Sequence, residues 1–247
     1  MKIVKADNYQ SWFIEYLNNS ILIDPWLTKR LQPKNSFFIQ RFKNNESCLS
    51  KDDINKVKAI IITAPFEDHL HLDSIKMLPN NTIIYTSNIV RRSLKKYKIS
   101  NPVKILSESG VSVFDLNIKA LPTSYPYYSS TFSLLIEDAD GNKVFHEGHR
   151  VNFKYLSKKN IKADVCILTA EESKLFGLIQ LGMNYKNTIK ASKMLESNHL
   201  FITGNKPNQT KGFIGNFIKT RTYDIEQLSK DITVYSDEGD SYSFNGE

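Results

Sequence analysis

The apolar run at residues 57–63 limits the possible folds more than any other feature of the sequence. It reads Val-Lys-Ala-Ile-Ile-Ile-Thr and is apolar at successive positions rather than at alternate ones. This pattern is typical of a strand that is buried on both faces. Ala64 and Pro65 end the run. We therefore expect a central strand whose sheet is covered by other layers of structure.

Helix-like and strand-like patterns alternate around this strand. A hairpin is predicted at 11–27, a long polar loop at 32–53, and an amphipathic basic helix at 88–100. Turn signals between 103 and 145 predict antiparallel hairpins. Beyond them we expect strands at 163–169 and 199–203, helices at 187–197 and near 212–220, and a terminal hairpin around 237–239. The order favours an α+β protein in which two mixed sheets lie between helices.

The composition narrows the class of protein further. The chain has 247 residues, 40% of them hydrophobic, and no linker of Pro, Gly or Ser divides it, so we predict a single domain over 1–247. No stretch approaches the roughly 20 apolar residues that cross a membrane, and the first residues lack the pattern of a secretory signal. Two cysteines cannot build a disulfide framework. A cytoplasmic protein without membrane insertion is expected.

Four of the five histidines lie in two tight clusters that follow predicted strands. The first is Glu67-Asp68-His69-Leu70-His71, and the second is His146-Glu147-Gly148-His149. Imidazole and carboxylate groups are the ligands of zinc, iron and manganese sites. Such short clusters also occur as solvated or locally hydrogen-bonded loop residues, so the spacing alone does not decide between the two.

The chain resembles the metallo-β-lactamase superfamily over nearly its whole length. Its hairpin at 11–27 looks like the opening of that family's simpler hydrolases, and Ala59 to His69 lies where the family has a strand followed by His-x-His-x-Asp-His. The resemblance implies a four-layer αββα sandwich, with two mixed β-sheets flanked by helices. It also implies a metal site along one edge of the sheets.

The sequence departs from the family motif at several ligand positions. The first two histidines of the motif fall on Ala64 and Phe66, which cannot bind a metal, so that only Asp68 and His69 remain. No histidine occurs near 124–126, where the family has its third. Because of these losses, we do not expect a standard dinuclear zinc site to form.

Two further positions resemble a divergent branch of the superfamily from cyanobacteria and plant plastids. Its members show Asp-His-x-His and Glu-Pro-His where this chain has 68–71 and 147–149, and His149 replaces the aspartate that usually bridges two metals. Gly204-Asn205 stands where the last histidine of the common pattern would be. The resemblance to this branch implies no particular activity.

The remaining side chains could hold one divalent metal ion, which would be zinc, iron or manganese. The candidate ligands are Asp68, His69, His71 and His149, with Glu67 and Glu147 as reserve ligands or as acceptors that orient the imidazoles. Asp68 is also the candidate catalytic residue, as ligand or base. Phe66, Tyr125 and Tyr127 are candidates for the lining of a pocket. Alternatively, Asp68 and His69 persist only as a hydrogen-bonded pair that keeps the loop in shape.

Three functional hypotheses follow from these residues. The first is a divergent hydrolase that cleaves an ester, lactone, amide or phosphoester of a small molecule with a metal-activated water. The second is a non-catalytic ligand-binding or regulatory protein that has lost the dinuclear site. The third is a nucleic-acid binder that uses the basic helix at 88–100. The net charge of +7 is spread through the chain and no nucleic-acid module is recognised, so nucleic acid is the least expected partner.

Overall fold

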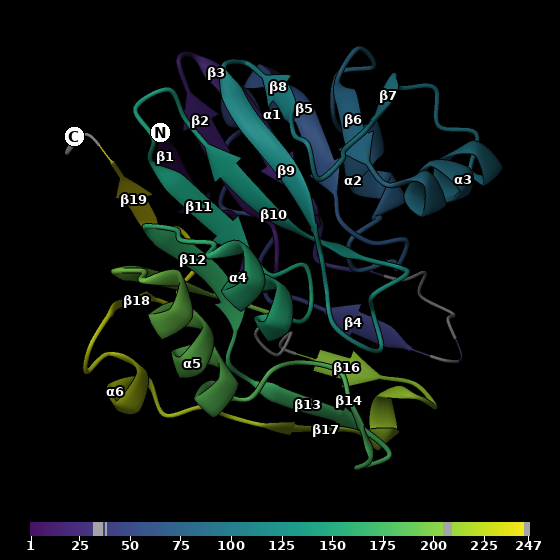
Figure 1. Ribbon diagram of the computed structural model, residues 1–247. Coiled ribbons are helices and arrows are strands. Elements are labelled where there is room, and N and C mark those ends of the chain that lie inside the picture. Colours follow the sequence, from purple (N-terminus) through teal and green to yellow (C-terminus); the bar gives the residue numbers. More distant parts are fainter. Residues whose placement is uncertain (32–36, 38, 205–208, 245–247) are drawn as a thin grey trace.

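Two mixed β-sheets of seven strands each lie face to face at the centre of the protein (Figure 1). The computed structural model describes residues 1–31, 37, 39–204 and 209–244. In order across the first sheet, the strands are β19 (Ser241–Ser243), β1 (Lys2–Lys5), β2 (Trp12–Tyr16), β3 (Asn19–Ile23), β5 (Val57–Ile62), β6 (Ile83–Thr86) and β7 (Val103–Ile105). Those of the second sheet are β18 (Thr233–Tyr235), β15 (His199–Thr203), β12 (Val165–Thr169), β11 (Lys143–His146), β10 (Phe132–Glu137), β9 (Leu116–Pro122) and β8 (Val111–Val113).

Helices cover the outer face of each sheet and complete four layers. The first sheet carries α1 (Lys51–Lys56), α2 (Leu72–Lys76) and α3 (Asn88–Lys96), and the second carries α4 (Phe153–Lys159), α5 (Tyr185–Leu195) and α6 (Ile225–Leu228). Three separate hydrophobic clusters fill the spaces between the four layers. The αββα sandwich predicted from the sequence is confirmed.

The central strand β5 shows why its sequence is apolar at successive positions. Ala59 and Ile61 point into the core between the two sheets, whereas Ile60 and Ile62 point into the layer beneath the helices. The strand pairs in parallel with both β3 and β6. It is therefore covered on both faces and both edges, and its carboxyl end delivers the loop 63–71 to one edge of the sandwich.

Several local predictions need correction. The basic helix α3 ends at Lys96, where Lys98 then takes a positive φ, so it is shorter than the predicted 88–100. The region 212–220 holds a 3₁₀ turn, η1 (Gly215–Phe217), and a strand rather than a helix. The expected terminal hairpin is wrong, because β18 pairs with β15 in one sheet and β19 pairs with β1 in the other. The loop predicted at 32–53 contains β4 (Gln40–Phe42) and the start of α1, and residues 32–36 and 38 lie outside the described residues.

A small third sheet lies beyond one end of the sandwich, at the bottom of Figure 1. It consists of β14 (Ile179–Gln180), β13 (Glu172–Leu175) and β17 (Ile218–Arg221), and next to it β16 (Gln209–Lys211) pairs with β4. We refer to residues 172–182 and 209–221 as the end module. Within the described part of the chain, no helix is both long enough and apolar enough to cross a membrane.

Candidate functional site

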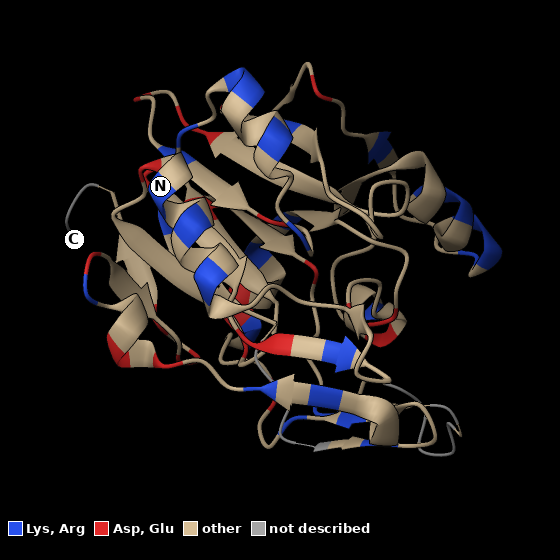
Figure 2. Ribbon diagram, turned by 60° about the horizontal axis from the view of Figure 1, so that its bottom comes forward, with Lys and Arg blue, Asp and Glu red and all other residues tan. Residues whose placement is uncertain are grey.

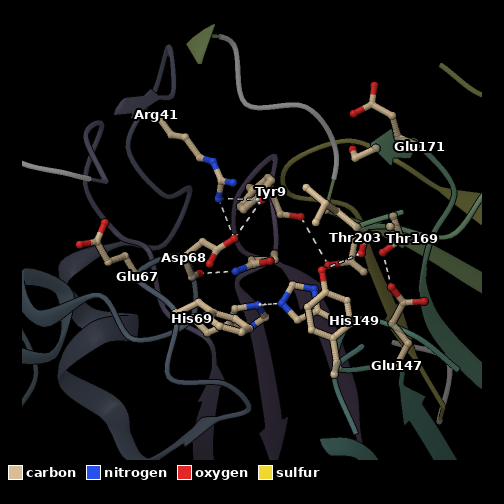
Figure 3. A pocket seen from close by; sticks show the side chains of 18 of the residues that line it. Tyr9, Arg41, Glu67, Asp68, His69, Glu147, His149, Thr169, Glu171 and Thr203 are labelled. Atoms are coloured by element: carbon tan, nitrogen blue, oxygen red, sulfur yellow. Dashed lines mark hydrogen bonds and ion pairs between the residues drawn. The ribbon is translucent and has the colours of Figure 1, made fainter. Parts of the chain in front are cut away.

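A cavity of about 550 Å³ opens at the edge of the sandwich where the loops after β5 and β11 meet the end module. Apolar surface makes up most of its wall. Both histidine clusters contribute to it through His69, His146 and His149. The fold thus brings together two segments that are about 80 residues apart in the sequence (Figure 3).

His69 bonds through Nδ1 to the buried carboxylate of Asp24. Asp24 is fully buried at the end of β3, and its Oδ2 lies 2.7 Å from His69 Nδ1. The backbone N–H and the hydroxyl of Thr63 donate to the same carboxylate at 2.8 and 2.5 Å. Burial alone would lower the pKa of His69, but the Asp24 carboxylate raises it above its ordinary value. The Asp24 carboxylate therefore favours the protonated form of His69.

The other ring nitrogen of His69 faces His149 directly. The two Nε2 atoms are 2.7 Å apart, so a proton must lie between them. Burial, together with the neighbouring charge of His69, lowers the pKa of His149 to about 3. His69 accordingly donates from Nε2 and His149 accepts as a neutral imidazole. Tyr127 stacks on the His149 ring with centroids 4.5 Å apart.

The backbone beside His149 is shaped by a glycine. Gly148 has a φ of +63°, and a Cβ there would collide with the carbonyl group of Phe132. His149 itself has a φ of 141°, which is unusual for a side-chain-bearing residue. This turn at the end of β11 directs the imidazole toward His69.

Asp68, next to His69 in the cavity wall, belongs to a second charge pair with Arg41 (Figure 3). Its Oδ2 accepts from Arg41 Nη1 at 2.7 Å and from the Tyr9 hydroxyl at 3.2 Å, and its backbone carbonyl accepts from Gln10. Although burial opposes ionisation, the Arg41 guanidinium holds the pKa of Asp68 well below its usual range. The carboxylate is thus ionised and paired with an arginine.

His146 presents a buried polar atom that has no partner among the described residues. The backbone N–H of Gly148 donates to His146 Nδ1 at 3.2 Å, so this nitrogen is unprotonated and the neutral ring carries its hydrogen on Nε2. Burial lowers the pKa of His146 to about 4, which keeps the ring neutral. Its Nε2–H is a buried donor without an acceptor in the described structure.

Glu147 presents a second such atom. It is 1% exposed, and burial raises its pKa to about 8. Thr169 donates its hydroxyl to Oε1, whereas Oε2 contacts no hydrogen-bonding group in the described part of the chain. At neutral pH this side chain is mainly a carboxylic acid, and its O–H is available in the cavity wall.

The described side chains do not fit the metal site that the family resemblance implies. Two nitrogen ligands bonded to one zinc at 2.0–2.1 Å lie roughly 3.3 Å apart in a tetrahedral site, whereas the His69 and His149 nitrogens are at hydrogen-bonding distance. Asp68 is paired with Arg41. Within the described ranges, no group of three or more His, Cys, Asp or Glu side chains could hold a metal ion. The Arg41 guanidinium supplies positive charge here, and Asp24 favours the protonated form of His69.

The structure brings some of the candidate residues together and separates others. Asp68, His69, His149, Glu147, Phe66 and Tyr127 all line the cavity. His71 lies outside it, because its Nδ1 bonds to the Ser74 hydroxyl at 2.7 Å at the start of α2. Tyr125 is 76% exposed and does not line the cavity. Glu67 lines its mouth, but its carboxylate points away from the two histidines (Figure 3).

Sequence reasoning missed Arg41 and Tyr9 and assigned no role to His146. Arg41 lies in the polar region between two predicted strands, where no pattern links it to Asp68. His146 belongs to a cluster that the sequence did reveal, and its position directly after an apolar strand was the available signal. Asn205, in the pair 204–205 aligned with the last histidine of the family pattern, lies outside the described residues.

Comparison with known proteins places the chain in a family. A family model described as the Beta-lactamase superfamily domain matches residues 7–201. No curated protein sequence matches the chain. Solved structures do match, and they include an isothiocyanate hydrolase from Delia radicum gut bacteria, with 17% identity, coverage of 99% of both chains and a TM-score of 0.74.

Two other solved structures show the same fold over the same length. A possible metal-dependent hydrolase from Veillonella parvula DSM 2008 is 16% identical, with 98% of both chains covered and a TM-score of 0.75. The metallo-beta-lactamase fold protein YhfI from Bacillus subtilis is 14% identical, with 98% of this chain and 99% of that chain covered and a TM-score of 0.66. At these identities the likeness concerns the fold, whereas the family model covers most of the sequence. The chain belongs to the beta-lactamase superfamily.

Proposed function

We propose that this protein binds a small, mainly apolar molecule with a hydrogen-bond acceptor in the cavity, and that it does so without a resident metal ion. The observation that carries the proposal is the pair of unpartnered buried atoms, His146 Nε2 and Glu147 Oε2, in the wall of one cavity. Leaving a buried donor without an acceptor costs about 1–3 kcal/mol. A ligand acceptor that meets either donor would remove that cost.

The character of the cavity supports this class of ligand. Small-molecule sites are mostly apolar, with a few fixed polar groups that orient the ligand, and this cavity has the same composition. Arg41 and His69 are each paired with a carboxylate, so neither demands an anionic ligand. A neutral molecule with a carbonyl or a similar acceptor fits best.

A binding experiment tests the ligand class. We suggest 2-octanone, δ-octalactone and hexyl isothiocyanate as probes, with octane as a probe that lacks an acceptor, and ligand-observed NMR as the measurement. His146→Phe removes one donor and should weaken binding of the acceptor-bearing probes roughly tenfold. His199→Phe is the matched control, because His199 does not line the cavity. Equal binding by wild type and His146→Phe would contradict the proposal.

Metal analysis tests the second part of the proposal. Protein purified without chelator should contain no more zinc, iron or manganese than the variant His69→Ala/His149→Ala. A metal present in wild type at one ion per chain, and absent from the variant, would show that the two rings separate to bind it.

Hydrolysis of the bound molecule is the second candidate function. It is favoured by the solved structures that share the fold over nearly the whole chain, among which are hydrolases. The substrates to test are esters, lactones, amides, phosphoesters and isothiocyanates. A neutral His149 with a pKa of about 3 is a weak base for activating water, so we place binding before catalysis. Turnover that disappears in His149→Ala would reverse this order.

The narrower resemblances stay predictions. Membership of the cyanobacterial and plastid branch rests on residues 68–71 and 147–149, and the cytoplasmic location rests on the composition. Nucleic-acid binding through α3 is an alternative that has no support from the cavity, because α3 does not contribute to it.

A further inference from the structure

The end module gathers exposed apolar side chains to an unusual degree. Six of the 14 large hydrophobic residues that are exposed in the described structure belong to it or contact it, and we call them the apolar tip. They are Phe37, Phe176, Leu178, Ile179, Phe213 and Phe217. Scattered single apolar residues are normal on a protein surface, but a contiguous group marks an interaction site.

The rings of the apolar tip contact one another. Phe213 stacks on Phe37 at 6.0 Å between centroids and meets Phe217 edge-on at 5.4 Å. Phe217 in turn lies 4.9 Å from Phe176. Leu178, in the turn between β13 and β14, is 87% exposed. The four phenylalanine rings therefore form one continuous surface, and the exposed Leu178 and Ile179 follow Phe176 closely in the chain.

Side chains of the paired strands β13 and β17 point alternately into the cavity and toward the opposite face of the small sheet. Ser173, Ile218 and Thr220 line the cavity. The alternate positions carry Lys174 beside Lys219 and Glu172 beside Arg221 in the strand register. In Figure 2 these two strands lie near the bottom of the view, with blue basic segments on both.

The charge of the end module is positive next to the apolar tip. Lys211, Lys219 and Arg221 are exposed, and Lys174 is partly buried and paired with Glu172 at 3.1 Å. The other acidic residue beside β13, Glu171, is buried in the cavity wall. An apolar group of aromatic and aliphatic side chains beside basic residues is the pattern of proteins that lie on anionic membranes.

We propose that the apolar tip, with Lys211, Lys219 and Arg221, docks this protein on an anionic lipid surface. Aromatic and aliphatic side chains enter the boundary between headgroups and acyl chains, while the basic side chains contact the lipid headgroups. This is attachment to a surface and involves no spanning segment. The inference is independent of the proposed ligand, although the same module forms part of the cavity wall.

The charges favour lipid over a second copy of this chain. A symmetric dimer through the apolar tip would place the basic residues of one copy near those of the other, and like charges at an interface are unfavourable. An anionic surface neutralises all of them at once. Self-association is therefore the competing outcome that the experiment has to distinguish.

Vesicle co-sedimentation with the full chain tests the proposal. Vesicles of phosphatidylcholine alone are compared with an equal mixture of phosphatidylcholine and phosphatidylglycerol. We expect binding to the anionic vesicles, little to the neutral ones, and weakening as salt rises. Phe176→Asn/Leu178→Ser should reduce the partition coefficient at least about tenfold, and Lys219→Gln should reduce it about fivefold.

Matched controls lie at the other end of the molecule and on another surface. Leu17 is also exposed in a hairpin turn with a positive φ, but it joins β2 and β3 far from the end module (Figure 1). Leu17→Ser should therefore bind vesicles like wild type. Lys95→Gln on α3 removes the same charge from another basic surface and should also have no effect. Circular dichroism and the unfolding midpoint of each variant show that it is folded.

Three outcomes would overturn the proposal. The first is no binding to anionic vesicles. The second is equal loss of binding in Lys219→Gln and Lys95→Gln, which would show that only the net charge matters. The third is a dimer in light scattering that Phe176→Asn/Leu178→Ser dissociates, without vesicle binding by either form. His146→Phe should leave vesicle docking unchanged, because His146 lies in the cavity wall and not in the apolar tip, so failure of the cavity proposal would be seen separately.

Discussion

Replacement of Glu147 by glutamine should stabilise the protein, by an amount that grows with pH. Glu147 is fully buried, and burial raises its pKa from 4.5 to about 8. In the unfolded chain the side chain ionises near its ordinary value, whereas in the folded protein it keeps its proton until pH reaches about 8. Between these values the folded state binds one more proton than the unfolded state, so stability falls as pH rises.

The size of the effect follows from the width of this pH window. Stability falls by roughly 1.4 kcal/mol for each pH unit, and so by on the order of 5 kcal/mol from the lower pKa to the upper. Glutamine resembles the protonated acid, still accepts from Thr169 through its carbonyl oxygen, and does not titrate. The variant should therefore be more stable than wild type at high pH and nearly equal to it at low pH.

Urea denaturation at a series of pH values from about 5 to 9 measures this difference. The control is Glu46→Gln, in which an exposed carboxylate is replaced. Its stability curve should run parallel to that of wild type. If the Glu147→Gln curve is also parallel to wild type over the whole range, Glu147 ionises normally and is not a buried donor in the cavity.

Three further perturbations test the charge pairs and the basic helix. Asp24→Asn removes the partner that raises the pKa of His69, so unfolding should become easier by about 3 kcal/mol. The loss of stability should be greatest below pH 6.5, where His69 is charged in both the folded and the unfolded state, and it should shrink as pH rises through the pKa of His69 in the folded protein. A loss of stability that does not depend on pH would contradict the pairing of Asp24 with protonated His69. Arg41→Met leaves the buried Asp68 carboxylate without its cationic partner and should lower the free energy of unfolding by on the order of 3 kcal/mol. The double variant Arg41→Met/Asp68→Leu should recover much of this loss. No recovery would show that the arginine stabilises the protein through packing. Lys95→Gln/Lys96→Gln should leave RNA retention in a filter assay unchanged at moderate salt, and a marked drop would revive the nucleic-acid hypothesis.

The strand β5 and the charged residues around it show which features are readable from sequence. The run 57–63 predicted a doubly covered strand because each of its residues faces a packed layer, and this depends only on local pattern. The histidine clusters were recognised for the same reason, since each follows an apolar strand. The 2.7 Å distance between the Nε2 atoms of His69 and His149 depends on how two different sheets stack, and the spacing of the histidines in the sequence could not predict it.

Two of the incorrect predictions share one cause. Residues 233–243 contain a turn that favours a local hairpin, but each flanking strand finds a longer-range partner at the edge of a different sheet. The region 212–220 was expected to be helical, yet β17 extends a sheet by pairing with β13. In both places pairing with a distant strand outweighed the local preference.

The sequence by itself determined the layered α+β sandwich, the two histidine clusters at strand ends, and the loss of the family's ligands at Ala64 and Phe66. Only the tertiary structure decided what replaced those ligands. It pairs His69 with Asp24 and Asp68 with Arg41, leaves His71 outside the cavity, and leaves two buried donors in its wall. The reason is physical: hydrophobic patterning acts along the chain and is visible in one segment, whereas the charge state and partner of a buried polar group depend on groups that folding brings from elsewhere.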